Sequence, residues 1–173
     1  MEELQNILNK MKNIEHGYVD ENGNKHTVID DRFFDLYRLQ SPKELIKSEL
    51  GVCWDQVELE RYFCEQENIE CKSYFIVYYY KECPTHTFLV CKNLDKYYWI
   101  ENSWEIYKGI YEFNCIEDLL KDVKNKFINF KKDRVTIDYN SKNLCMYEYN
   151  VPIFGVNYSD FCKHCEQGKN III

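Results

Sequence analysis

Three residue types suited to nucleophilic catalysis occur within one third of the chain. Cys53 follows Gly51-Val52 at the predicted start of a helix, where unpaired backbone N–H groups and the helix dipole favour a thiolate. The same N–H groups, including that of Cys53, could stabilise an oxyanion on an attacked carbonyl carbon. His86 opens a predicted strand and is the candidate base, and Glu101 or Asn102 is the candidate group that orients it. These residues together predict a cysteine nucleophile with a histidine partner.

The choice between Glu101 and Asn102 depends on the register of one predicted hairpin, whose turn lies at 93–96. If the loop holds an even number of residues, His86 shares a sheet face with Glu101 on a diagonal; if the number is odd, His86 lies directly across from Asn102. The sequence leaves both registers open. Glu101 is the favoured partner, because a carboxylate also stabilises the imidazolium that pairs with a thiolate.

Apolar spacing and turn residues predict the elements that position these side chains. The pattern predicts an α+β fold, with an antiparallel sheet packed against an N-terminal helical part. A short hairpin is expected between Tyr18 and Val28, and Ser41 and Ser159 are expected to cap helices. The expected helices cover 3–14, 42–48, 53–68, 116–130 and 159–168, and the expected strands cover 71–80, 86–91, 97–101 and 133–139.

Length and composition restrict the class of protein. The 173 residues and the net charge of −7 fit a single acidic domain, 1–173. An acidic chain without a basic cluster is not expected to bind nucleic acid. No apolar run reaches the roughly 18 residues of a membrane helix, and no signal peptide is evident, so we expect a cytoplasmic protein without a membrane partner. The nine cysteines are irregularly spaced and odd in number, so most should be free thiols.

The stretch from about Ser48 to Trp104 resembles the transglutaminase-like superfamily, whose members are relatives of the papain-like cysteine proteases. The resemblance rests on Gly51-Val52-Cys53-Trp54 at a helix start, on His86 opening a strand, and on a polar residue 15 or 16 positions later. The segment Glu101-Asn102-Ser103-Trp104 is also similar to the Asn-Ser-Trp of the papain family, which would nominate Asn102.

The resemblance implies a fold of transglutaminase-like/cysteine-proteinase type and a triad of Cys, His and Asp type. Cys53 would be the nucleophile, His86 the general base and acid, and Glu101 would stand in place of the usual Asp. The papain family carries an oxyanion glutamine six positions before its cysteine, whereas this chain has Lys47 there. Gln56 lies on the other side of Cys53.

The function implied is that of a cysteine-dependent amide hydrolase or acyltransferase, working through a thioester. Its substrate would be a peptide, a protein or a small amide, and the reaction calls for no metal or organic cofactor. The alternative is a catalytically inactive module that keeps the fold and binds a peptide or protein partner.

Cys162-Lys163-His164-Cys165 has the Cys-x-x-Cys spacing of a zinc knuckle or a redox pair. A tetrahedral site would need two further ligands, which only distant residues such as Cys145 or His26 could supply. We therefore expect a C-terminal helix with two small apolar residues rather than a metal or redox site.

Overall fold

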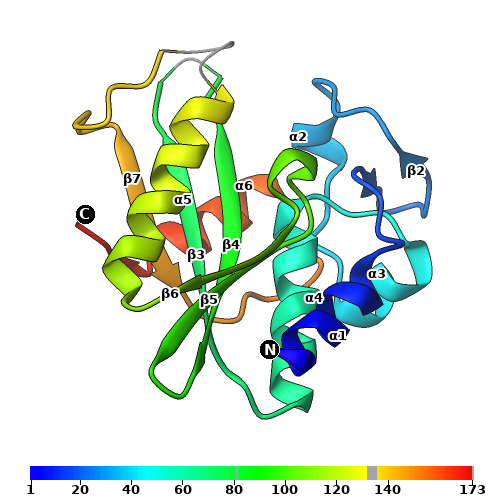
Figure 1. Cartoon of the computed structure of the whole chain (residues 1–173). Helices are drawn as coiled ribbons and strands as arrows, with labels where there is room; N and C mark the ends of the chain where they lie inside the picture. The colour runs from blue at the N-terminus through cyan, green and yellow to red at the C-terminus, as the bar shows by residue number, and fades with distance from the viewer. Residues whose placement is uncertain (81, 132–135, 173) are drawn as a thin grey trace.

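A six-stranded antiparallel sheet forms the centre of the computed structural model, which describes residues 1–80, 82–131 and 136–172 (Figure 1). Every pairing within it is antiparallel. The strands in spatial order are β6 (Gly109–Phe113), β5 (Lys96–Glu101), β4 (Thr85–Asn93), β3 (Glu70–Tyr78), β7 (Leu144–Tyr149) and β8 (Lys169–Asn170).

Helices cover both faces of this sheet. The long helix α5 crosses one face, and α4 and α6 pack on the other (Figure 1). Helices α1 and α3 lie beside α4, and α2 lies beside α6. The helices are α1 (Glu2–Met11), α2 (Phe33–Leu36), α3 (Pro42–Ser48), α4 (Cys53–Gln66), α5 (Ile116–Lys131) and α6 (Tyr158–Glu166), with a 3-10 turn η1 (Glu105–Tyr107) after β5.

Alternation along β4 divides the core into layers. Phe88 and Val90 pack under α5, whereas Leu89 and Cys91 pack under α4 and α1. A third cluster, around Trp54, joins the start of α4 to α2, α6 and the middle of β3. The sheet is therefore buried on both faces, which explains why its central strands carry almost continuous apolar runs.

The structure confirms the α+β class and most of the predicted elements. Ser41 caps α3 with Glu44 in a capping box, as its spacing predicts. The sheet is larger than predicted, because the short strands β6, β7 and β8 carry weak patterns that escaped detection. The expected cap at Ser159 is wrong: the Asn157 side chain accepts the N–H of Asp160 at 2.9 Å, so α6 begins at Tyr158. Residues 136–139 form no strand, and the rest of the strand predicted over 133–139 lies outside the described residues.

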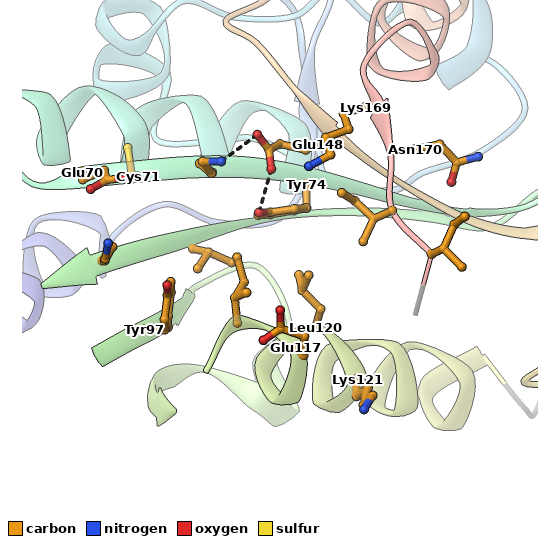
Figure 2. A pocket seen from close by; sticks show the side chains of 16 residues that line it. Glu70, Cys71, Tyr74, Tyr97, Glu117, Leu120, Lys121, Glu148, Lys169 and Asn170 are labelled. Atoms are coloured by element: carbon orange, nitrogen blue, oxygen red, sulfur yellow. Dashed lines mark hydrogen bonds and ion pairs between the residues drawn. The ribbon is translucent and has the colours of Figure 1, made fainter. Parts of the chain in front are cut away.

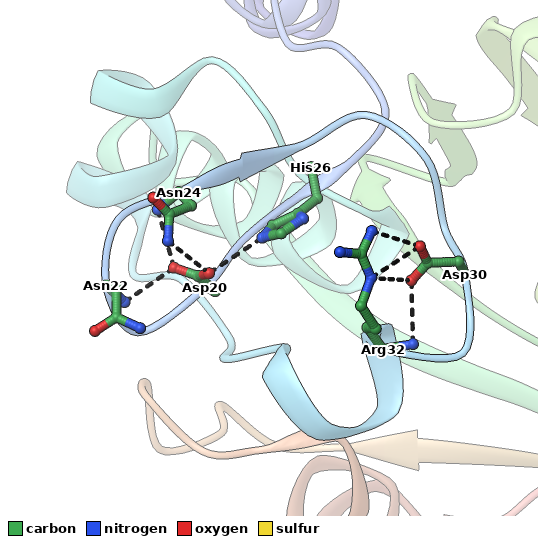
Figure 3. A network of polar contacts seen from close by, with 6 residues as sticks. All are labelled: Asp20, Asn22, Asn24, His26, Asp30 and Arg32. Carbon is green, nitrogen blue, oxygen red and sulfur yellow. Dashed lines mark hydrogen bonds and ion pairs between the residues drawn. The ribbon is translucent and has the colours of Figure 1, made fainter.

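A second, two-stranded sheet, β1 (Tyr18–Val19) and β2 (Lys25–His26), confirms the predicted short hairpin. Figure 3 shows that the Asp20 carboxylate closes its turn, accepting the backbone N–H groups of Asn22 and Asn24 at 2.9 Å each. The His26 ring lies 3.1 Å from the same carboxylate and stacks on Tyr18. A short polar side chain that accepts nearby N–H groups is typical of a turn.

In the described ranges, no helix has both the length and the apolar character required to cross a membrane.

Candidate active site

Helix α4 presents Cys53 as its first residue. The Asp55 carboxylate accepts the N–H of Val52 at 3.0 Å and that of Gln40 at 2.9 Å, which fixes the chain where the helix begins. Gly51 allows the close approach of α3, because a Cβ there would lie 2.6 Å from the Leu45 side chain. Cys53 is a half-buried residue, although most of its neighbours are buried.

The register of the β4–β5 hairpin decides the partner of His86. Lys92 pairs with Tyr97, so the loop is even, and His86 and Glu101 share a face. The His86 Nε2 and Glu101 Oε2 atoms lie 2.9 Å apart. Both residues are buried, His86 being 1% exposed and Glu101 3%. This contact leaves Nδ1 as the histidine nitrogen available to Cys53.

Glu101 is itself held by the turn that follows β5. Its Oε1 atom accepts the Ser103 N–H at 2.7 Å, the Ser103 hydroxyl at 2.8 Å and the Trp104 N–H at 2.8 Å. Its Oε2 atom is thereby directed at His86. A carboxylate fixed by three donors loses little conformational freedom when it orients the imidazole.

Trp104 covers the imidazole of His86. The two rings are stacked with centroids 3.8 Å apart and an angle of 6° between their planes. Phe130 of α5 lies against the other side of Trp104, with ring centroids 5.2 Å apart. The aromatic layer excludes water from the His86–Glu101 pair, which strengthens the electrostatic interaction between them.

The charges of this group favour a thiolate and an imidazolium. Burial raises the pKa of the Cys53 thiol, but the hydrogen bond and positive charge of His86, together with smaller effects of Thr87, outweigh burial, so the pKa of Cys53 lies below its ordinary value. Burial opposes protonation of His86, yet the charge of Glu101 and hydrogen bonds to Cys53 and Glu101 raise the pKa of His86 to about 9. Both shifts favour the thiolate–imidazolium form of the pair.

Other thiols of the chain have the opposite tendency. Burial raises the pKa of Cys83, raises that of Cys162 to about 12 and raises that of Cys165 further. The pKa of Cys71 is raised chiefly by its hydrogen bond with Cys64. All nine cysteines are free thiols, as their spacing predicts.

Asn102, the alternative partner, has a different position. Its side-chain nitrogen donates to the Gln56 side-chain oxygen at 2.7 Å and to the Met11 carbonyl at 3.3 Å. Gln56 in turn donates to the Gly51 carbonyl at 2.9 Å. Both amides therefore tie α1, α4 and β5 together, and neither contacts His86.

Helix α6 gives the two cysteines of the Cys-x-x-Cys pair different surroundings. Cys165 is buried in the core, Cys162 is only partly buried, and His164 lies 2.8 Å from the Asn150 carbonyl. Throughout the part of the chain that the structure describes, no three His, Cys, Asp or Glu side chains gather in a way that could hold a metal ion.

A cavity of about 860 Å³ lies elsewhere, between α5 and the sheet (Figure 2). Figure 2 shows Tyr74 and Glu148 on its wall, joined by a hydrogen bond of 3.1 Å. None of Cys53, His86 and Glu101 lines this cavity. The cavity is therefore separate from the candidate active site.

No protein-family model and no curated protein matches the chain. The chemistry must therefore be inferred from the arrangement of its side chains.

Two features of the site escaped sequence reasoning. Thr87, next to His86, lies beside the thiol of Cys53 and helps to lower its pKa. Glu60, two helical turns after Cys53, is fully buried, and burial raises its pKa well above the ordinary value. The helical spacing of Glu60 from Cys53 was available in the sequence, but whether a charged residue is buried depends on the tertiary packing.

Proposed function

We propose that this chain is a transglutaminase-like cysteine enzyme that hydrolyses or transfers an amide through a thioester on Cys53. The observation that carries the proposal is the row Cys53, His86, Glu101, in which one imidazole is positioned between a thiol and an anchored carboxylate. A nucleophile, a base and a group that orients the base are the three parts that such catalysis needs.

In the proposed first step, the Cys53 sulfur attacks the carbonyl carbon of the amide. The carbon–nitrogen bond breaks, the imidazolium of His86 gives its proton to the departing amine, and a thioester remains. The amides at the start of α4 stabilise the negative charge on the carbonyl oxygen, because these N–H groups have no partner within the helix.

In the second step, neutral His86 takes a proton from water or from an amine, which attacks the thioester. The thiolate of Cys53 leaves, and the imidazolium is restored. Glu101 holds the ring with Nδ1 toward the sulfur throughout and stabilises the imidazolium. These steps call for no metal and no organic cofactor, and the substrate is a peptide, a protein or a small amide.

Trapping the acyl-enzyme tests this function. The purified chain would be mixed with p-nitrophenyl acetate and its mass measured with time, followed by peptide mapping of the acetyl group. We expect one acetyl group on Cys53, none in Cys53→Ala, and an unchanged result in the matched variant Cys162→Ala. Addition of a primary alkylamine would distinguish transfer, which yields the acetylated amine, from hydrolysis.

Acetylation that is absent, or that spreads over several cysteines in both wild type and Cys53→Ala, would contradict the enzyme. The inactive binding module would then be the better explanation, and peptide binding would be the property to measure.

A further inference from the structure

Strand β4 has an open edge beside Cys53. Its pairing with β3 extends from Thr85 to Lys92, but its pairing with β5 begins only at Leu89. The first residues of β4 therefore have a neighbouring strand on one side only. The start of α4 packs on the sheet face here, since the Trp54 ring lies 6.4 Å from that of Phe75, the register partner of Thr87.

The backbone of Thr87 points toward this open edge. The N–H of Tyr78 donates to the Pro84 carbonyl at 3.1 Å, which makes this pair a hydrogen-bonded one. Hydrogen-bonded and non-hydrogen-bonded pairs alternate along an antiparallel ladder, so Thr87 and Phe75 form a non-hydrogen-bonded pair. The N–H of Thr87 is therefore directed away from β3, toward the open edge of β4.

The side chain of Thr87 lies on the α4 face of the sheet. Alternation places it with Leu89 and Cys91, which pack under α4, and opposite to Phe88. Thr87 is 1% exposed, and its hydroxyl has no hydrogen-bond partner in the described structure. A buried hydroxyl without a partner costs free energy unless a ligand or a charged group uses it.

Cys53 is the group that can use this hydroxyl. After burial and the two effects of His86, the N–H and the hydroxyl of Thr87 are the further causes that lower the pKa of Cys53. Cys53 packs against the cluster that contains Phe75, which is the register partner of Thr87. Anion binding by two converging donors is the principle of an oxyanion hole.

The other titratable groups near Cys53 do not supply this stabilisation. Tyr37, Glu60 and Cys162 also interact with the charge on Cys53, but burial raises the pKa of each, which favours the neutral form of all three. His86 is the positive partner, and Glu101 acts on Cys53 through it. Beyond His86, the stabilising donors near the sulfur are those of Thr87.

We propose that Thr87 is a thiolate-stabilising residue, whose backbone N–H and hydroxyl both donate to the Cys53 sulfur at the open edge of β4. This role rests on the proposed function, in which Cys53 is the nucleophile. It adds a fourth residue to the row Cys53, His86, Glu101 and assigns a use to an otherwise unpartnered buried hydroxyl.

The test compares two variants that each delete one buried hydroxyl without a partner. Thr87→Val keeps the shape and the backbone N–H and removes the hydroxyl. Ser73→Ala is the matched control, because Ser73 is also fully buried and unpartnered, on the neighbouring strand β3. The rate of iodoacetamide alkylation of Cys53 would be measured against pH, with the urea midpoint of unfolding as a check on the fold.

In Thr87→Val we expect the midpoint of the Cys53 alkylation profile to move to higher pH, because a hydrogen bond to a charged group is lost. On the acid side of the profile the alkylation rate should fall roughly tenfold. Ser73→Ala should keep the wild-type profile. If wild type, Thr87→Val and Ser73→Ala share one profile and Cys53 is activated in all three, the role of Thr87 is overturned, whereas the proposed function stands. If wild-type Cys53 is not activated, the proposed function itself fails.

Discussion

The molecule contains two histidine–carboxylate pairs that are alike in their immediate geometry. His86 lies 2.9 Å from Glu101, and His26 lies 3.1 Å from Asp20. Each carboxylate also accepts backbone N–H groups from the turn that follows it. Each imidazole is stacked on an aromatic ring, His86 on Trp104 and His26 on Tyr18.

The pairs differ in what lies on the other side of the imidazole. His86 is 2% exposed at its side chain and shares a hydrogen bond with Cys53. His26 is 17% exposed at its side chain, and among the described residues no thiol is its partner. The Asp20 pair closes a hairpin turn, as Figure 3 shows, whereas the Glu101 pair orients a base toward a nucleophile.

This difference shows that an oriented histidine is a common structural device. What distinguishes the candidate site is Cys53, the first residue of α4, which interacts with the imidazole of His86. Variants of the His86–Glu101 pair should therefore change the reactivity of Cys53, whereas variants of the His26–Asp20 pair should leave that reactivity in place.

Replacing the two histidines should separate the pairs most clearly. His86→Ala should slow acylation of Cys53 by p-nitrophenyl acetate roughly 10³-fold or more, since the base is lost. His26→Ala should leave the acylation rate within about twofold, because the hairpin is not part of the proposed site. Equal losses in both variants would contradict a special role for His86.

The two carboxylates should differ in the same direction. Glu101→Gln should slow acylation roughly 10²-fold and move the alkaline limb of the pH–rate profile to lower pH, because the charge of Glu101 raises the pKa of His86. Asp20→Asn should lower the melting temperature of the protein and leave the profile in place. An unmoved alkaline limb in Glu101→Gln would show that its carboxylate does not act on His86.

Asn102 should affect stability rather than rate. Asn102→Ala removes its bonds to Gln56 and the Met11 carbonyl, so the free energy of unfolding should fall by about 1–3 kcal/mol. The acylation rate per folded molecule should change less than about threefold. A larger rate loss than in Glu101→Gln would make Asn102 the functional partner of His86.

Glu60 is a buried carboxylate without a histidine, and its effect should be seen in the pH dependence of stability. The unfolded chain ionises Glu60 above about pH 4.3, whereas the folded chain, in which burial raises the pKa of Glu60, binds the proton more tightly, so the contribution of Glu60 to the free energy of unfolding falls as pH rises. Glu60→Gln should reduce this fall between about pH 5 and pH 8 in urea titrations. The exposed Glu65→Gln on the same helix is the control, and identical slopes in both variants would refute the effect.

Much of the fold follows from local signals in the sequence. The capping box at Ser41, the apolar period of α5 and the turn between β4 and β5 each act within a few residues, so they are legible without tertiary information. The strands β6, β7 and β8 are short and mixed in polarity, and their pairing depends on neighbours far along the chain. For the same reason the sheet predicted from the sequence lacks these three strands.

The candidate residues Cys53, His86 and Glu101 could be named from the sequence, but the contacts that hold them could not. Glu101 rather than Asn102 contacts His86 because the β4–β5 loop has an even number of residues. The turn residues in the sequence are compatible with both an even and an odd loop. The burial of Glu58 also required the structure, in which its carboxylate pairs with Arg61 at 3.0 Å and accepts the Tyr149 hydroxyl. Side-chain partners across elements are decided by packing, which no local pattern encodes.

The alkylation rate of each cysteine as a function of pH tests directly whether Cys53 is a nucleophile activated by His86. The nine cysteines of wild type and of His86→Ala would be labelled with iodoacetamide between about pH 5 and pH 9, and each site read by peptide mass spectrometry. We expect that Cys53 alone reacts fast below pH 7 in wild type and that it loses this advantage over the other cysteines in His86→Ala. A Cys53 that reacts no faster than the other cysteines, or equally fast without His86, would contradict it.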